Sequence, residues 1–584
     1  MKFKHALRYL PFIDTLQDYS FTKFRADIIS GLTVAIVALP QSMAYAMIAG
    51  VHPKYGLYAA IIPTIVSALF GSSRFLIAGP TNAISMVVAS TLASTAIAGT
   101  VISGMPEEQK IGLLFLLSFL VGVIQLALGL AKVGKLVGFI SHSVIVGFTA
   151  GAGILIAFNQ LKNLLGISFA NTTEFIETAH QTFTHLPETN PFALAIGLFT
   201  ITFILTAKHF SKSFPGALVS MILATLGVVL FDLDAHKIKL IGEIPRSLNF
   251  LSVPAFSIDN IRPLFGPALA IALLGVVEAL SIAKSIASSC GDKINGNQEF
   301  IGQGLSNVSA AFFSSIPGSG SFTRSAVNFR AGAKTRLSAV YSGLLVLITL
   351  IALAPYARFI PIASLAGILM VIAYAMVDQK AIALAYKATR SDRIVMIVTL
   401  LTTIFLELEF AIYVGVILSI ALFLRKVSQP HVTKVCPRAA DNKLIACEKE
   451  QRSCPQVSIY QIDGSLFFGA IEELERKLSI LHTGTEKVKA VIIRMKGVQV
   501  IDATSVHSLE KFVEDCRKNN MTVIFTNVAK PVLKVLRNSG ALSLIGERNI
   551  AADTTAAITQ AYALLDRKIC HDCPAKVFKE CQKK

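Results

Sequence analysis

Apolar segments long enough to cross a lipid bilayer recur between Asp27 and about Leu424, and this feature constrains the fold more than any other. A helix needs about 20 mainly apolar residues to span the roughly 30 Å hydrocarbon core of a membrane. Only 15% of the 584 residues are charged, whereas soluble domains average about 25%. The sequence therefore predicts a polytopic α-helical membrane protein.

The apolar pattern predicts about fourteen membrane segments, two of which are broken helices. The full spans are expected at residues 27–50, 55–70, 109–131, 143–165, 191–209, 215–231, 263–284, 299–314, 336–354, 360–377, 391–406 and 410–424.

The two broken segments are rich in glycine, proline and small hydroxyl residues. Ser315 to Ala333 reads S-I-P-G-S-G-S-F-T-R-S-A-V-N-F-R-A-G-A, and Ala78 to Ser85 reads A-G-P-T-N-A-I-S. Because lipid cannot satisfy free N–H and C=O groups, broken backbone at membrane depth must be buried in protein or line a polar cavity. Two half-helices in corresponding places are typical of inverted-repeat transporters. Their N-termini present free N–H groups and a positive dipole end, which favour an anion.

The residues that open the two half-helices are the first candidate ligands. A helix is expected to begin at about Phe322, and the backbone amides at both openings would bind the anion. These positions are Thr81, Asn82 and Ala83 in the first half-helix and Ser321, Phe322 and Thr323 in the second. Simple helix capping by the same residues is the structural alternative.

Two ionisable residues within the membrane segments are candidates for function by default. Arg324 precedes Arg336 by twelve residues, which is about 18 Å along a continuous helix and too deep for easy snorkelling. Its functional interpretation is a fixed positive charge beside the anion, and its structural alternative is an internal partner for Glu278. Both can hold, since one arginine can serve a carboxylate and a substrate at different stages of a cycle. Glu278 lies near the middle of the eighth full-length or broken span counted along the chain and is the candidate proton carrier.

Loop charges indicate the orientation. With the N-terminal segment 1–26 in the cytoplasm, the basic residues Arg74, Arg330 to Arg336 and Lys380 to Arg393 fall inside, while Glu107 and Glu108 fall outside. This arrangement satisfies the positive-inside rule, and an even number of spans returns the C-terminus to the cytoplasm. Membrane topology thus explains the net charge of +18, without a basic patch for nucleic acid. No cleavable signal peptide is visible.

The composition turns soluble after the transmembrane domain, 27–424, and a linker, 425–454. Residues 455–567 alternate β-rich runs with amphipathic helices, which predicts a small α/β domain. Asp502 and Thr504 stand where a helix cap is expected, and no nucleophile–base or metal constellation suggests an enzyme.

Eight cysteines include six in the linker and in the tail, 568–584. In the cytoplasm they are expected to be reduced thiols. Cys570 and Cys573 have the spacing of metal ligands or of a redox pair, although a single pair is weak evidence. We expect no cofactor.

Three motifs carry a resemblance to a known family. They are D-I-I-S-G-L-T-V-A-I-V-A-L-P-Q-S-M-A-Y-A at Asp27, G-P-T-N at Gly79, and G-S-F-T-R-S-A-V-N at Gly320 with A-G-A-K-T following it. Together they make the chain similar, over nearly its whole length, to the sulfate permease (SulP/SLC26) family of anion transporters, with a C-terminal part that resembles a STAS domain.

The resemblance implies a 7+7 inverted repeat of the UraA-like type, a substrate site between the third and tenth helices, and a homodimer. In family sulfate transporters the positions of Gln41 and Tyr45 contact the anion, although Gln41 could instead join helices around a proline kink. Thr504 aligns with a position that is phosphorylated in some STAS regulators, but Ser505 replaces the usual glycine. The resemblance to STAS regulators also implies cytoplasmic partners of this domain.

The leading hypothesis is proton-coupled sulfate uptake through the bacterial inner membrane by an elevator-like movement. Sodium-coupled bicarbonate members of the family have aspartate at position 278 with a hydroxyl residue one turn later, where this chain has Glu278 and Ile282. A dianion entering against about 100 mV meets roughly 4.6 kcal/mol, which cotransported protons would offset. The alternatives are a bicarbonate or dicarboxylate carrier and a membrane anion sensor that signals through the STAS domain.

Overall fold

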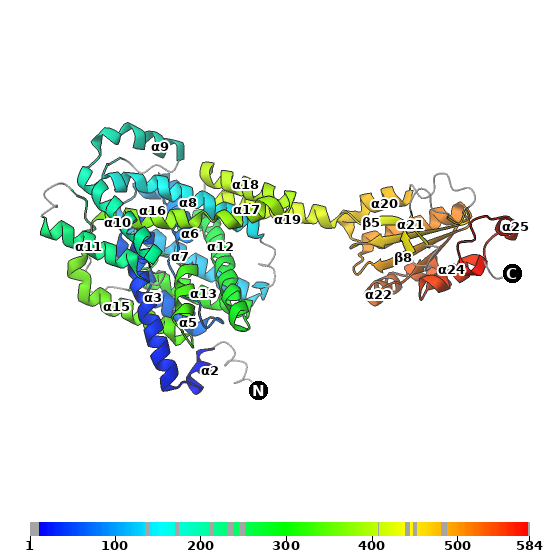
Figure 1. The fold of residues 1–584 in the computed structure, drawn as a ribbon, viewed down its shortest axis with the longest axis horizontal. Helices are drawn as coiled ribbons and strands as arrows, with labels where there is room; N and C mark the ends of the chain where they lie inside the picture. Colours follow the sequence, from blue (N-terminus) through cyan, green and yellow to red (C-terminus); the bar gives the residue numbers. More distant parts are fainter. Residues whose placement is uncertain are drawn as a thin grey trace. The chain divides into compact units, whose positions relative to one another are not determined.

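The computed structural model describes residues 11–97, 99–134, 141–169, 175–210, 214–231, 238–243, 251–406, 408–437, 444–447, 453–479 and 488–581. The chain forms two compact units, Met1–Ser419 and Ile420–Lys584, of which the first is helical and the second mixes helices and strands (Figure 1). Parts of the predicted N-terminal segment, linker, C-terminal domain and tail lie outside the described residues.

The described helices of the first unit account for every predicted membrane segment. One bundle contains α3 (Phe21–Ile48), α4 (Pro53–Ala59), α5 (Ile62–Phe70), α6 (Asn82–Ser94), α7 (Glu107–Leu130), α12 (Ile258–Cys290), α13 (Gly296–Phe312), α14 (Phe322–Arg330) and α15 (Leu337–Ala357). The second contains α8 (His142–Leu165), α10 (Pro191–Phe210), α11 (Gly216–Leu230), α16 (Ile362–Met376) and α18 (Arg390–Phe405). The last span, α19 (Leu408–Val427), crosses the boundary between the units.

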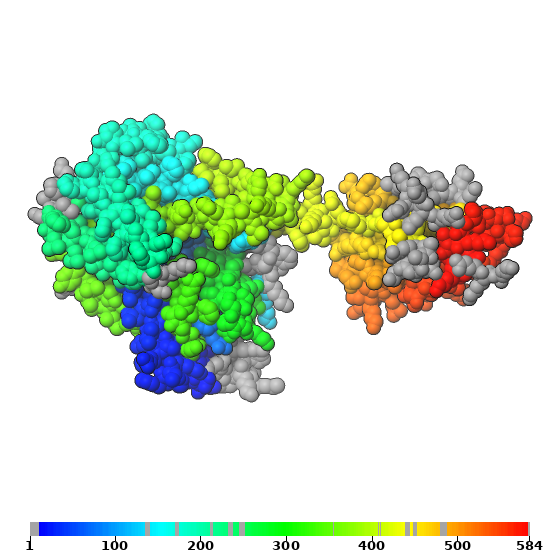
Figure 2. All heavy atoms as spheres, in the orientation of Figure 1, coloured from blue at the N-terminus to red at the C-terminus, as the bar shows by residue number. Residues whose placement is uncertain are grey.

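The outer helices expose apolar side chains, as lipid contact requires. Helices α10 and α11 pack side by side and are visible on one face in Figure 2. Their exposed large hydrophobic residues are Phe192, Leu198, Phe199, Leu205, Phe210, Ile222, Leu223, Leu226, Val229 and Leu230. Eight helices in the described part of the chain are long and apolar enough to span a membrane, and the prediction of a polytopic membrane protein is confirmed.

The two predicted breaks meet each other. Ala78–Gly79 forms strand β1 and Ser319–Gly320 forms strand β4, and the two pair in antiparallel fashion with Ala78 opposite Gly320. A strand pair satisfies the backbone groups that each break frees from helical bonding. The two half-helices α6 and α14 therefore begin from one shared structure.

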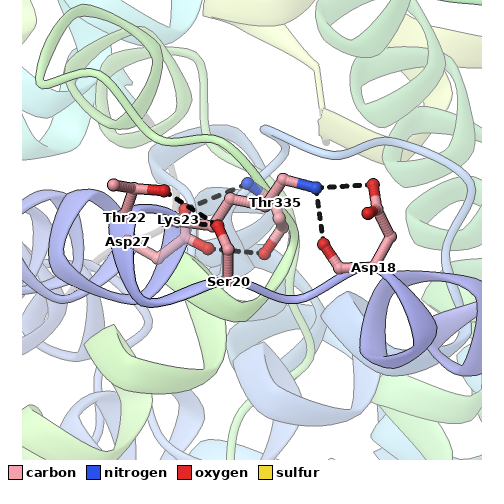
Figure 3. Close-up of polar contacts among 6 residues, drawn as sticks. All are labelled: Asp18, Ser20, Thr22, Lys23, Asp27 and Thr335. Atoms are coloured by element: carbon pink, nitrogen blue, oxygen red, sulfur yellow. Dashed lines mark hydrogen bonds and ion pairs between the residues drawn. The ribbon is translucent and has the colours of Figure 1, made fainter.

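Asp27 ties the start of the first span to the segment between α14 and α15. Its carboxylate accepts hydrogen bonds from the backbone N–H groups of Lys334 (2.7 Å) and Thr335 (3.0 Å) and from the Thr335 hydroxyl (2.5 Å). Figure 3 shows the Asp27 and Thr335 side chains facing each other, near the exposed pair formed by Lys23 and Asp18. Because Asp27 is fully buried, its carboxylate supplies the hydrogen-bond acceptors that water cannot supply to the N–H groups of this loop.

The second unit is the predicted α/β domain. Its six-stranded sheet has the order β10-β9-β8-β7-β5-β6. The strands are β5 (His431–Pro437), β6 (Leu444–Ala446), β7 (Val457–Asp463), β8 (Ala490–Gly497), β9 (Thr522–Thr526) and β10 (Ile550–Ala551). Helices α20 (Ile471–Ser479), α21 (Ala503–Lys518), α22 (Lys530–Asn538), α23 (Ala541–Ile545), α24 (Thr554–Tyr562) and α25 (Arg567–His571) complete it.

Strands β5 and β6 fall within the predicted linker, and they correct one expectation. Cys436 on β5 and Cys447, just after β6, form a disulfide with their Cα atoms 5.1 Å apart. The prediction of reduced thiols is wrong for this pair. Antiparallel pairing of β5 with β6 brings the two cysteines together, and nothing in their sequence spacing indicates that pairing.

We expect Asp27→Asn to destabilise the first unit. The amide retains only one acceptor oxygen, so at least one buried donor of the 334–335 segment loses its partner, at a cost of about 1.5–3 kcal/mol. Thermal unfolding of the detergent-solubilised protein, followed by circular dichroism, should show a lower midpoint. Asp18→Asn is the matched control, since the Asp18 side chain is 91% exposed; equal midpoints for the two variants would contradict the role of Asp27.

Candidate functional site

The candidate site lies where α6 and α14 begin. The Thr81 hydroxyl accepts a hydrogen bond from the N–H of Ile84 and caps α6, and the Ser321 hydroxyl does the same for α14 through the N–H of Arg324. The N–H of Ser321 also donates to the carbonyl of Ile77 on the other half-helix segment (2.8 Å). The predicted start of a helix at Phe322 is confirmed. Thr81 and Ser321 are also helix caps, as the structural alternative proposed.

Arg324 places a positive charge between the two breaks. Its side chain is fully buried, and Nη2 donates to the carbonyl of Pro80 at 2.5 Å. Its Nε and Nη1 find no acceptor among the residues that the structure describes. A buried guanidinium normally satisfies its donors, so two donors remain for a further anionic partner.

The depth of Arg324 has a different cause from the one expected. Helix α14 ends at Arg330, and the chain turns through Gly332 (φ +90°) before α15 begins. Arg324 and Arg336 therefore do not share a continuous helix, and that part of the prediction is wrong. Arg324 is buried because β1 and the start of α6 lie against it.

Glycine is required where the two breaks approach each other. A Cβ on Gly318 would lie 2.3 Å from the carbonyl oxygen of Gly79, and a Cβ on Gly79 would lie 2.9 Å from Nη1 of Arg324. Gly79 also has φ +141°, a backbone conformation that residues other than glycine rarely adopt. The strand pair and the arginine position thus both depend on these glycines.

Glu278 on α12 faces the same structure. The Thr81 hydroxyl donates to its Oε2 at 3.3 Å, so one residue both caps α6 and contacts the carboxylate. Arg324 interacts with Glu278 electrostatically, but the described residues show no direct ion pair between them.

The remaining predicted site residues divide into buried and exposed groups. Gln41 and Tyr45 on α3 are buried, and Tyr45 is within electrostatic reach of both Arg324 and Glu278. Oε1 of Gln41 finds no partner among the described residues. At the helix openings, Ala83 is buried and Asn82 is half-buried, while Phe322 and Thr323 are exposed.

Several polar residues near the site were not predicted. The hydroxyls of Ser42 and Ser85 are buried without a partner in the described part of the chain. They lie next to Gln41 on α3 and within the first turn of α6. Polar residues in the middle of apolar spans are uncommon, so they could have been noticed, but serine also fits helix interfaces without any ligand.

A buried amide network behind β4 was also missed. The Asn307 amide bonds both sides of Gly318, since Nδ2 donates to its carbonyl (3.0 Å) and Oδ1 accepts from its N–H (2.8 Å). Asn307 also donates to Oε1 of Gln125 (2.8 Å), and Gln125 donates to the carbonyl of Ala272 on α12 (3.3 Å). The network connects β4 to the helix that carries Glu278.

In the second unit, Asp502 caps α21. One carboxylate oxygen accepts from the N–H of Ser505 (2.9 Å) and the other from the N–H of Phe468 (2.7 Å). Burial opposes ionisation, but these donors outweigh it and lower the pKa of Asp502. Thr504 is exposed at the second position of the helix, so the cap expected from Asp502 or Thr504 belongs to Asp502.

Comparison with known proteins is consistent with this architecture. Residues 24–399 match the sulfate permease family and residues 449–557 match the STAS domain. YvdB of Bacillus subtilis (strain 168), named for sulfate transport, is 31% identical over 541 residues, which cover 92% of this chain and 98% of YvdB.

Two solved structures share the fold. Murine Slc26a9, an anion transporter in the inward-facing state, superposes over 96% of this chain and 95% of its own with a TM-score of 0.87 and 21% identity. The transmembrane domain of the cyanobacterial bicarbonate transporter BicA matches 69% of this chain and 98% of its own with a TM-score of 0.59 and 27% identity.

We expect Asn307→Asp to destabilise the protein. A carboxylate has no N–H to donate, so its oxygens would face the Gly318 carbonyl and the Gln125 amide oxygen in a fully buried place. An unsatisfied buried acceptor costs about 1–3 kcal/mol, and more when that group is itself charged, as a carboxylate is. The thermal midpoint should fall well below that of Ser309→Ala, which removes a hydroxyl bonded only within α13. Equal midpoints would rule the network out as a support of β4.

Proposed function

The chain belongs to the sulfate permease family of membrane transporters, and we propose that it carries sulfate inward across the bacterial inner membrane together with protons. The observation that carries the proposal is the buried Arg324, which keeps two donors without a partner in the described residues between two half-helix N-termini.

The charge of the site suits a dianion. Arg324 contributes one positive charge, and each helix N-terminus contributes roughly half a charge. Buried N–H donors at helix ends bind sulfate and phosphate groups readily. Gln41, Tyr45, Thr81, Asn82, Ala83, Ser321, Phe322 and Thr323 would complete the binding site. The Bacillus subtilis relative is named for sulfate transport, which supports the same substrate.

Glu278 is the proposed proton carrier. Its contact with the Thr81 hydroxyl connects its carboxylate to the cap of α6, where the anion would bind. An anion close to Arg324 would weaken the hold of that arginine on the carboxylate, and a proton would then be favoured there. Proton and anion would in this way enter the site together, and the proton would offset the cost of moving a dianion against the membrane potential.

Alternating access is proposed to use the two bundles. Both half-helices, Arg324 and Glu278 belong to the bundle that contains α3, α12 and α13, and this bundle would move as an elevator against the one that contains α8 and α16. We further propose a homodimer with cytoplasmic N- and C-termini, in which the STAS domain faces cytoplasmic partners and Thr504 is exposed to a kinase.

Bicarbonate is the second candidate substrate, because BicA is a bicarbonate transporter that shares the fold of the transmembrane unit. Radiolabelled sulfate uptake into proteoliposomes, with unlabelled bicarbonate, dicarboxylate and sulfate as competitors, separates the candidates. We expect saturable sulfate uptake that excess unlabelled sulfate blocks. Sulfate binding without turnover would instead indicate an anion sensor, and uptake of labelled bicarbonate without any uptake of labelled sulfate would indicate a bicarbonate carrier.

Arg324→Ala should abolish sulfate binding while the protein stays folded. The substitution removes the charged group that donates to the carbonyl of Pro80, together with the two donor nitrogens that lack a partner among the described residues. Isothermal titration calorimetry with sulfate should show at least a tenfold weaker affinity, with Arg330→Ala, at the exposed end of the same helix, as the control. Wild-type affinity in Arg324→Ala would refute its electrostatic role.

Glu278→Gln should uncouple sulfate uptake from protons. The amide has nearly the same shape as the acid but cannot exchange a proton, so an imposed inward proton gradient should no longer stimulate uptake. The measurement is radiolabelled uptake in proteoliposomes with and without that gradient. Glu188→Gln, at an exposed position, should keep the wild-type response. Persistent gradient-driven accumulation in Glu278→Gln would remove Glu278 from the coupling step.

A further inference from the structure

The last membrane span ends beside a polar groove of the second unit. The apolar part of α19 closes at Val427, and its last turn carries the basic residues Arg425 and Lys426. Basic side chains at the end of a span extend toward the lipid headgroups. Ser428, the first residue after the helix, therefore lies at the level of the headgroups.

The groove has a volume of about 310 Å³, within the range of roughly 300–1,000 Å³ that small-molecule sites have. Arg425 and Gln429 line it on one side of Ser428, and Glu472 and Arg476 line it from α20. The Nζ of Lys477, also on α20, donates to the carbonyl of Pro430 (2.8 Å) and holds α20 beside the end of α19. Both walls of the groove thus belong to the second unit.

The groove carries charges of both signs. Glu473 is already paired, since its Oε1 lies 2.7 Å from Nη2 of Arg476 and 3.1 Å from Nζ of Lys477. Arg425 and Glu472 are exposed, and neither has an ion pair within the part of the chain that the structure describes. One positive and one negative group are therefore available to a ligand in the same groove.

An apolar stripe of α19 leads into this groove. Ile420, Leu424 and Ser428 follow one another at intervals of four residues, and such residues share one face of a helix. The N–H of Ser428 donates to the carbonyl of Leu424 (2.8 Å), so the helical spacing extends to Ser428. Ile420 and Leu424 are 39% and 47% exposed. A face that is open to lipid chains thus continues into the polar wall of the groove.

We propose that the groove binds the headgroup of phosphatidylethanolamine from the surrounding bilayer. The phosphate would face Arg425 and the primary ammonium would face Glu472, while an acyl chain follows Ile420 and Leu424. A primary ammonium has three N–H donors for a carboxylate, whereas the choline headgroup has none and phosphatidylglycerol has no cation. The pair of charges therefore selects this lipid over the other two.

Native mass spectrometry of the full-length protein in detergent measures the affinity for each added phospholipid. We expect the wild type to bind dioleoyl phosphatidylethanolamine more tightly than phosphatidylcholine or phosphatidylglycerol with the same chains. Glu472→Gln should weaken binding of phosphatidylethanolamine about fivefold, as loss of one exposed charge pair does, without changing that of phosphatidylcholine. Arg425→Gln should weaken binding of all three lipids.

Two charge-matched variants serve as controls. Glu514→Gln and Arg537→Gln change exposed residues outside the groove, and both should keep the wild-type affinities. Because Arg425 and Glu472 are exposed as well, their variants should stay folded, which far-ultraviolet circular dichroism checks.

Carbodiimide coupling locates the headgroup directly. The reagent joins a carboxylate to a primary amine in contact with it, so treatment of the protein in phosphatidylethanolamine vesicles should leave a lipid adduct on the peptide that contains Glu472. The adduct should be absent from that peptide in Glu472→Gln. Several results would overturn the proposal: equal affinities for the three lipids, a preference for phosphatidylglycerol, wild-type affinity in Glu472→Gln, or adducts only on carboxylates outside the groove.

Discussion

The hydrogen bond from Arg324 to the carbonyl of Pro80 is the interaction on which the candidate anion site depends. It joins two segments 244 residues apart and holds a guanidinium inside a membrane domain, where a charge is costly unless it is paired or faces a polar site. Neighbouring residues make this contact possible. Gly79 and Gly318 permit the close approach, and the caps at Thr81 and Ser321 direct two helix N-termini to the same place.

Polar side chains then connect this contact to the rest of the bundle. Thr81 reaches Glu278 on one side, while Asn307 and Gln125 connect β4 to α12 on the other. The Ser319 hydroxyl adds a bond to the carbonyl of Gly275 (2.7 Å), one turn before Glu278. The candidate site and Glu278 therefore belong to one hydrogen-bonded structure. In the proposed mechanism that structure moves as a whole, and its internal distances need not change.

Much of the fold could be predicted from the sequence, because the bilayer imposes a length and an apolar composition on each span. The half-helices were predictable as well, since Gly-Pro and Gly-Ser breaks stand out within apolar runs. The position of Glu278 near the middle of a membrane span was also predictable, because it is an acidic residue in an apolar segment. The register of β1 against β4 was not, because two two-residue strands carry no periodicity. The distance from Arg324 to Arg336 was counted along a continuous helix, although Gly332 lies between them and turns the chain. The Cys436–Cys447 pairing depends on a strand pair within a polar segment.

The central claim is that an oxyanion binds between the start of α6 and the start of α14, against Arg324. The most direct measurement is a cryo-electron-microscopy map of the protein with selenate, a heavier analogue of sulfate, compared with a map without it. The account predicts added density within hydrogen-bonding distance of the Arg324 guanidinium and the first backbone amides of both half-helices. Density at another place in the transmembrane unit, with none at Arg324, would contradict it.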